Sequence, residues 1–200
     1  MTTTRHERAV TLAVVAGTLF MTTFAGVVVS VVLPLIASSF GEPPDGAVQW
    51  VVIGYLLVQA ALLLTAGRLA DLVGRKPIWV IGLALFTLGT LLCGLATSVS
   101  LLIAFRVLLS IGGALSLALS TAMLADAFPP AELSRAMAWN AIVLGVAIGL
   151  GPSLGGIVAQ HLGWRGIFLV TVPVGAIALG ISGAVLPRTE RGQPGKLDLA

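Results

Sequence analysis

Six long apolar runs restrict what this chain can fold into. They cover residues 9–37, 48–66, 77–96, 101–125, 136–159 and 167–186. Each is close to or longer than the roughly 20 residues that a helix needs to cross the hydrocarbon core of a bilayer. Charged residues make up only 10% of the chain, whereas a soluble domain carries about 25%, so they are too few to cover a water-facing surface. The sequence therefore predicts an all-α polytopic membrane protein with six transmembrane helices.

The first apolar run is predicted to be a transmembrane helix rather than a cleaved signal peptide. Arg5 and Arg8 precede it, as basic residues precede the apolar region of a signal peptide. That region has only about 7–15 residues in signal peptides, and the run over 9–37 is far longer. We therefore count it as the first of the six spans.

The basic residues predict the orientation. If the N-terminus is inside, the inner segments contain nine of the eleven Lys and Arg residues, and the outer loops contain only Arg165. An excess of Lys and Arg marks cytoplasmic loops. We therefore expect a multi-pass protein of a plasma membrane, such as the bacterial inner membrane, with both termini in the cytoplasm. Residues 1–186 are predicted to form the bundle, and residues 187–200 a cytoplasmic linker.

The segment 67–77, between the second and third runs, is predicted to be a tight polar loop. Asp71 precedes Arg75 by four residues, a spacing at which the two side chains pair if the segment is helical. The segment resembles the signature loop between helices two and three of the major facilitator superfamily, although Leu72 stands where a basic residue is usual. The matching positions are Gly67, Leu69, Ala70, Asp71, Gly74, Arg75 and Lys76. This resemblance implies a cytoplasmic contact between two six-helix bundles; the alternative is a basic loop that only sets the orientation.

Arg106 is the one charged residue well inside an apolar run. A charge at this depth is costly, so such residues usually face a cavity or a polar partner. Ser110 and Gly113 follow it by four and seven residues and share its helix face. The run 106–114 resembles the fourth-helix motif of the same superfamily, which implies a part for Arg106 in handling substrate or protons. The alternative is an arginine whose side chain extends to the outer membrane surface.

The uncharged polar residues near the middle of apolar runs include Thr22, Thr23 and Gln59. They are candidates to line a substrate pathway. The alternative is that they only form hydrogen bonds to neighbouring helices, as such residues commonly do in membranes.

Glycines and one proline dominate the middle of the fifth run. The glycines form two pairs with a spacing of four, which lets helices approach closely in lipid, and the proline should kink the helix. The residues are Gly145, Gly149, Gly151, Pro152, Gly155 and Gly156. They resemble the fifth-helix antiporter motif of drug exporters in the superfamily. We expect both glycine pairs to face a second bundle; the alternative is a generic packing seam.

Two further segments, 50–57 and 163–175, resemble the EmrB/QacA-type fourteen-helix drug:proton antiporters, and the likeness covers nearly the whole chain. Ala25 and Ser30 depart from that pattern, since an acid and an asparagine are usual at those positions, and Gly166 and Thr171 replace a tryptophan and an asparagine. No Asp or Glu lies deep in any of the six runs, and Asp126 lies only at the inner end of the fourth. A carboxylate for proton coupling would therefore come from outside this chain.

The resemblance implies the N-terminal six-helix half of a multidrug efflux transporter of the major facilitator superfamily. Its expected partners are the lipid bilayer, a hydrophobic drug-like molecule, a proton and the C-terminal half of the transporter, with no nucleic acid, cofactor or metal. The alternative is a non-transporting six-helix membrane protein, structural or regulatory, or an inactive truncated product.

An enzyme is not expected. Residues 180–183 match the G-x-S-G pattern of six-helix intramembrane proteases, with Ser182 as the nucleophile. A serine nucleophile needs a base within hydrogen-bond reach. His161 is predicted at the outer end of the fifth run and Ser182 near the inner end of the sixth, and no histidine follows Ser182.

Overall fold

The computed structural model describes residues 5–43 and 45–185 of the chain. The described residues form helices and no strands, so the predicted all-α class is confirmed. The elements in order are α1 (Arg5–Phe40), the short 3₁₀ helix η1 (Ala47–Gln49), α2 (Trp50–Val73), α3 (Arg75–Gly94), α4 (Val99–Ala127) and α5 (Pro130–Val185). Within these residues, five helices are long and apolar enough to cross a membrane. The predicted linker at 187–200 lies outside the described residues.

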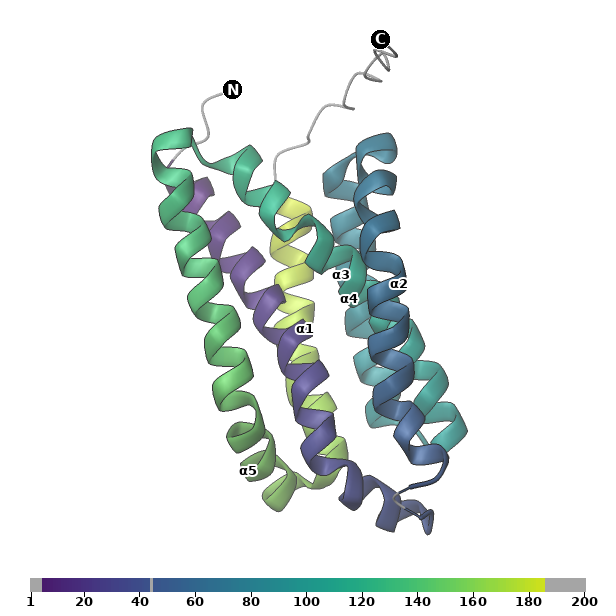
Figure 1. The fold of residues 1–200 in the computed structure, drawn as a ribbon. Helices are drawn as coiled ribbons and strands as arrows, with labels where there is room; N and C mark the ends of the chain where they lie inside the picture. The colour runs from purple at the N-terminus through teal and green to yellow at the C-terminus, as the bar shows by residue number, and fades with distance from the viewer. Residues whose placement is uncertain (1–4, 44, 186–200) are drawn as a thin grey trace.

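The six expected spans are found in five helical elements, because the fifth and sixth expected spans are joined without a break in α5. Helix α5 has 56 residues, which would extend about 84 Å at 1.5 Å per residue, far beyond a hydrocarbon core of about 30 Å. Its backbone leaves the helical conformation at Gly163, where φ is 68° and ψ is 176°. The chain reverses there, so α5 consists of two antiparallel segments (Figure 1). Glycine reaches this φ without the steric penalty that a Cβ imposes.

The predicted polar loop at 67–77 is also almost entirely helical. Helix α2 continues through Val73 and α3 begins at Arg75, so only Gly74 separates them. Gly74 has φ of 111° and ψ of 144°, and its N–H donates to the carbonyl of Ala70 at 2.8 Å. Pro77 then lies in the first turn of α3, where its missing N–H removes no helical hydrogen bond. A single glycine is therefore enough to turn the chain between two helices.

Helix α4 packs closely against α3 through glycines, as is common between membrane helices. A Cβ placed on Gly89 of α3 would lie only 2.7 Å from the backbone of Leu109 in α4. A Cβ on Gly112 in α4 would likewise collide with the backbone of Phe86 and Gly82 in α3. Helix α4 also packs on α2, while α1 packs mainly on α5. In Figure 1, α2 and α3 lie on one side of the bundle and α1 lies beside α5, while α4 crosses from the side of α2 and α3 toward the start of α5.

The buried apolar side chains form two clusters, one toward each end of the bundle. One contains Val32, Ile36, Val48 and Leu102, near the turns at Gly41–Gly46 and Gly163, and we call this the Gly163 end. The other contains Val14, Ala66, Trp79 and Leu119, near Gly74 and the α4–α5 connection, and we call this the Gly74 end. The polar residues of the candidate site lie near the boundary between the two clusters.

Candidate functional site

Arg106 of α4 lies fully inside the bundle and joins three helices. Its Nε donates to the carbonyl of Val51 in α2 at 3.0 Å, and its Nη1 donates to the carbonyl of Ala25 in α1 at 2.8 Å. The guanidinium carbon lies 4.2 Å from the centre of the Tyr55 ring, close enough for a cation–π interaction. Arg106 therefore points into the bundle and does not extend to the membrane surface, which removes that alternative.

Tyr55 connects Arg106 to the other predicted polar residues. Its hydroxyl donates to the carbonyl of Thr22 at 3.0 Å and accepts a hydrogen bond from the Gln59 amide at 3.2 Å. The Ser110 hydroxyl donates to the carbonyl of Tyr55 at 2.6 Å. A Cβ on Gly113 would lie 3.4 Å from the Gln59 Nε2 and 3.7 Å from the Tyr55 hydroxyl. We call these residues, with Arg106 and Tyr55, the Arg106 cluster: Thr22, Tyr55, Gln59, Arg106, Ser110 and Gly113.

The structure thus brings together five of the six predicted pathway residues. Thr22 takes part through its backbone carbonyl, since its hydroxyl donates to the carbonyls of Thr18 and Leu19 in its own helix. Thr23 is the exception, because it makes no hydrogen bond to the cluster among the described residues. Tyr55 was not predicted as a site residue. A signal was available, because Tyr55 is the chain's single tyrosine and lies four residues before Gln59, on the same helix face.

The Arg106 cluster holds a positive charge that no described carboxylate balances. The described ion pairs all lie at the Gly74 end. Within the described residues, no group accepts a hydrogen bond from Nη2 of Arg106. Gln59 is half-buried, whereas Arg106 and Tyr55 are fully buried. Gln59 is therefore the member through which a molecule outside the bundle could contact the cluster.

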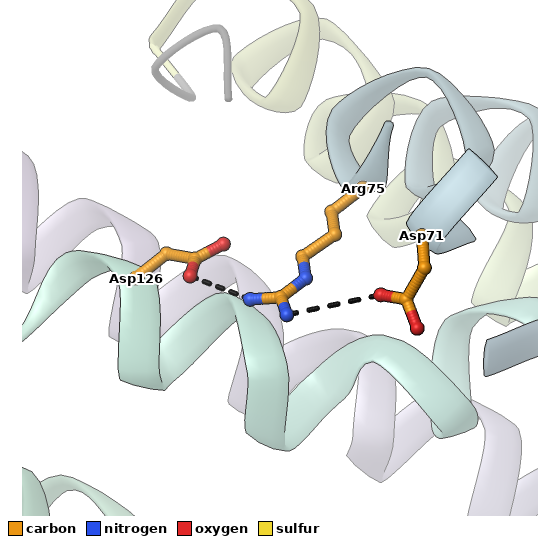
Figure 2. A network of polar contacts seen from close by, with 3 residues as sticks. All are labelled: Asp71, Arg75 and Asp126. Carbon is orange, nitrogen blue, oxygen red and sulfur yellow. Dashed lines mark hydrogen bonds and ion pairs between the residues drawn. The ribbon is translucent and has the colours of Figure 1, made fainter. Parts of the chain in front are cut away.

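A second polar group joins α2, α3 and α4 at the Gly74 end. Nη1 of Arg75 donates to Asp126 at 2.6 Å, and its Nη2 lies 3.9 Å from Asp71 (Figure 2). Asp71 and Arg75 form the ion pair that their spacing allows, but Asp126 is the closer partner. The Asp71 side chain is 70% exposed, compared with about 30% for Arg75 and Asp126. Sequence reasoning gave Asp126 no role, because 51 residues separate it from Arg75.

The remaining residues of the predicted loop motif have less defined surroundings. A Cβ on Gly67 would meet no atom within 4 Å, so close packing does not require glycine there. Lys76 is half-buried in the first turn of α3. Asp71 and Arg75 take part in the ion-pair group, and Gly74 forms the turn between α2 and α3.

The two glycine pairs of α5 do not share one face. Gly151 and Gly155 are buried against α1, where a Cβ on Gly155 would collide with Val28. Around Gly145, Gly149 and Gly156 no atom lies within 4 Å of an added Cβ. At 100° per residue, Pro152 shares the face of this open group, and the buried pair lies roughly 100° around the helix. The expectation that both pairs face a second bundle is therefore wrong for Gly151 and Gly155.

At the Gly163 end, Arg165 and Trp164 of α5 connect this helix to α1 and to the segment between α3 and α4. Nη2 of Arg165 donates to the carbonyl of Ala96 at 2.9 Å, and its guanidinium stacks on Trp164 at 4.3 Å. The Trp164 Nε1 donates to the hydroxyl of Ser39 at 2.9 Å. From the sequence, Arg165 contributed only to the prediction of orientation. In the structure, its contacts with Ala96 and Trp164 stabilise the turn at Gly163.

Ser182 lies far from the histidine that the protease pattern would need. The buried Ser182 accepts a hydrogen bond from Nε1 of Trp79 at 3.4 Å, while His161 lies at the other end of the bundle, beside Gly163. In the part of the chain that the structure describes, no three His, Cys, Asp or Glu side chains lie close enough to hold a metal ion.

Fold and site together define a multi-pass membrane protein: long apolar helices around a polar group that contains a buried arginine. The family model of the Major Facilitator Superfamily matches residues 15–199. The chain belongs to this family.

Curated members of the family align with most of the chain. The riboflavin transporter RibZ of Clostridioides difficile is 32% identical over 182 residues, which are 91% of this chain and 40% of RibZ. The multidrug resistance protein Stp of Mycobacterium tuberculosis is 42% identical over 163 residues, 80% of this chain and 30% of Stp. The tetracenomycin C resistance and export protein of Streptomyces glaucescens is 36% identical over 177 residues, 88% of this chain and 32% of that protein. The chain thus spans 30–40% of the length of these relatives.

Solved structures share the fold. A bacterial homologue of the human lysosomal transporter Spinster, in an inward-facing unoccupied conformation, superposes with a TM-score of 0.73 at 22% identity. That match covers 98% of this chain and 47% of the other. The occupied inward-facing form gives a TM-score of 0.77 at 20% identity, covering 94% and 47%.

Proposed function

We propose that this chain is the N-terminal half of a multidrug efflux transporter that exports small lipophilic molecules by alternating access, in exchange for protons. The observation that carries the proposal is the Arg106 cluster, a buried arginine tied to α1 and α2 in mid-bundle. Buried charges inside membrane bundles generally mark substrate or ion pathways. Relatives named for multidrug resistance and for tetracenomycin C export support the substrate class.

In this proposal, Gln59 contacts the substrate and Arg106 positions the residues around it. Gln59 is the half-buried member of the cluster, and its amide is bonded to Tyr55, which lies over the guanidinium. A lipophilic molecule would gain contact with the apolar wall of α2 and one hydrogen bond from the amide. Because no described carboxylate lies in the cluster, the proton acceptor would belong to another part of the transporter.

A second bundle is part of the proposal, and the open face of α5 is where it would contact this one. Gly145, Gly149, Pro152 and Gly156 share that face and have little packed against them. Large apolar side chains of α2, such as Leu64 and Leu72, are also exposed. Two bundles that rock about a site near the midplane are the general arrangement of such transporters.

A reconstitution experiment tests the transport function. The full-length gene product in liposomes should take up a lipophilic cationic dye in a saturable manner when a proton gradient drives exchange, and an ionophore that collapses the gradient should stop it. Uptake that ignores the gradient would contradict proton exchange. Riboflavin belongs in the panel, because one relative is named for its transport. A folded protein that moves none of these compounds would favour the non-transporting alternative.

The proposal places the Gly74 end in the cytoplasm, because most basic residues lie there. In a variant whose buried native Cys93 is replaced by serine, a cysteine at Asp45 or at the exposed Leu162 should react with a membrane-impermeant maleimide added to intact cells. A cysteine at Arg75 should react only after the cells are permeabilised. The reverse pattern would overturn the orientation while leaving the fold unchanged.

A further inference from the structure

An open hollow lies between α1 and α5 at the Gly74 end. Its volume is about 690 Å³. Helix α1 contributes Arg5, Arg8 and Leu12 to its wall, and the start of α5 contributes Glu132, Arg135 and Trp139. None of these residues belongs to the Arg106 cluster or to the Asp71–Arg75–Asp126 group. The hollow therefore needs an explanation of its own.

The wall of the hollow carries a surplus of positive charge. Arg8 donates to Glu132 at 3.1 Å, so these two charges offset each other. Arg5 and Arg135 are exposed, and no described residue forms an ion pair with either. The hollow also adjoins the first turn of α5 at Pro130, where the helix dipole is positive. An anion would therefore be attracted to this hollow.

The rest of the wall is apolar, and this decides between a free anion and a lipid. Leu12, Phe128, Ala136 and Trp139 line it beside the arginines. Trp139 is half exposed, and tryptophan is enriched at the level of the lipid headgroups. A free phosphate would use the arginines and leave the apolar wall in water, whereas a phospholipid would cover both.

We propose that this hollow binds an anionic phospholipid, whose phosphate lies between Arg5 and Arg135 and whose glycerol and upper acyl chain lie against Trp139 and Leu12. Basic pockets between transmembrane helices are known to bind anionic headgroups. The bound lipid would connect α1 to α5 where the partly exposed Arg8–Glu132 pair alone is a weak link. The inference needs the membrane-spanning fold of the family and does not depend on transport activity.

Native mass spectrometry of the delipidated full-length gene product tests the site. Phosphatidylglycerol should bind more tightly than phosphatidylcholine with the same acyl chains. Each basic residue near an anionic lipid contributes a factor of about five in affinity. The double variant Arg5→Gln/Arg135→Gln should therefore bind phosphatidylglycerol about 30-fold more weakly, whereas Arg5→Lys/Arg135→Lys should retain most of the affinity. Arg68→Gln is the matched control, because Arg68 is also exposed at the Gly74 end but lies outside the hollow.

Each result decides the proposal. A phosphatidylglycerol preference that is lost in the glutamine double variant, and kept in the lysine double variant and in Arg68→Gln, supports it. A preference that survives in the glutamine double variant, or that falls equally in Arg68→Gln, overturns it. Competition by millimolar inorganic phosphate without any lipid preference would make the hollow a site for a free anion. Because wild-type transport is measured separately, a failed dye assay and a failed lipid assay are distinguishable.

Discussion

Arg106→Met is expected to reduce transport by the full-length gene product at least about 100-fold while leaving the bundle folded. The two hydrogen bonds from the guanidinium to Ala25 and Val51 hold α1 and α2 in register with α4. Hydrogen bonds from a charged donor contribute about 1.5–3 kcal/mol each, and each 1.4 kcal/mol corresponds to a factor of about ten. The measurement is dye uptake into proteoliposomes, together with the thermal unfolding midpoint.

Stability should respond differently from transport to this substitution. Arg106 is a buried charge without a described counter-ion, which is costly in a membrane. Removing an unpaired buried charge recovers its desolvation cost, which offsets the loss of the two hydrogen bonds to Ala25 and Val51, so the unfolding free energy of Arg106→Met should change by less than about 2 kcal/mol. Arg106→Lys keeps the charge but loses the planar fork, and it should also lose most transport. Ser120→Ala is the control, because Ser120 is buried in the same helix and bonds only to its own helix.

A loss of stability that parallels the loss of transport would contradict this interpretation. Arg106 would then be a structural residue, and the cluster would have no demonstrated part in transport. Normal uptake by a stable Arg106→Met variant would also contradict this interpretation, since it would show that transport does not need the Arg106 side chain.

The helices and the buried arginine could be predicted from the sequence, because both depend on local composition. Long apolar runs require spanning helices, and a lone arginine inside one of them requires polar partners. The identity of those partners could not be predicted. They are the backbone carbonyls of Ala25 and Val51. Every residue has a backbone carbonyl, so nothing in the side chains of Ala25 and Val51 indicates that theirs accept these hydrogen bonds. Tyr55 has the same difficulty, since its contact with Arg106 depends on how α2 packs on α4.

The errors have physical reasons as well. Charged residues at 67–77 suggested a loop, but helix ends in water keep their backbone hydrogen bonds, and one glycine was enough for the turn. The chain reverses at Gly163 without a gap between the two helical segments, so the fifth and sixth expected spans form the single element α5. The two glycine pairs of α5 are six residues apart and therefore offset by about 120° around the helix. This offset could have been read from the sequence, but the prediction followed the family resemblance and placed both pairs on one face.

Asp126→Asn is expected to reduce transport about tenfold, and more than Asp71→Asn does. Asp126 accepts a 2.6 Å hydrogen bond from Arg75 and is only about 30% exposed. Asp71 lies 3.9 Å from Arg75 and is 70% exposed, and ion pairs between exposed groups contribute only about 0–1 kcal/mol. Because the Asp126 contact joins the start of α3 to the end of α4, its loss should shift the balance between the transporter's conformations. A shift of 1.4 kcal/mol in that balance corresponds to a factor of about ten.

The charge-swapped pair Arg75→Asp/Asp126→Arg separates this contact from a general need for a carboxylate. If the ion pair between α3 and α4 is what matters, the double variant should recover part of the uptake that either single variant loses, and all variants should reach the membrane in equal amounts on immunoblots. Equal losses in Asp71→Asn and Asp126→Asn, with no recovery in the double variant, would mean that each carboxylate acts separately. In that case both aspartates would contact the second bundle directly, and the geometry around Arg75 would be secondary to those contacts.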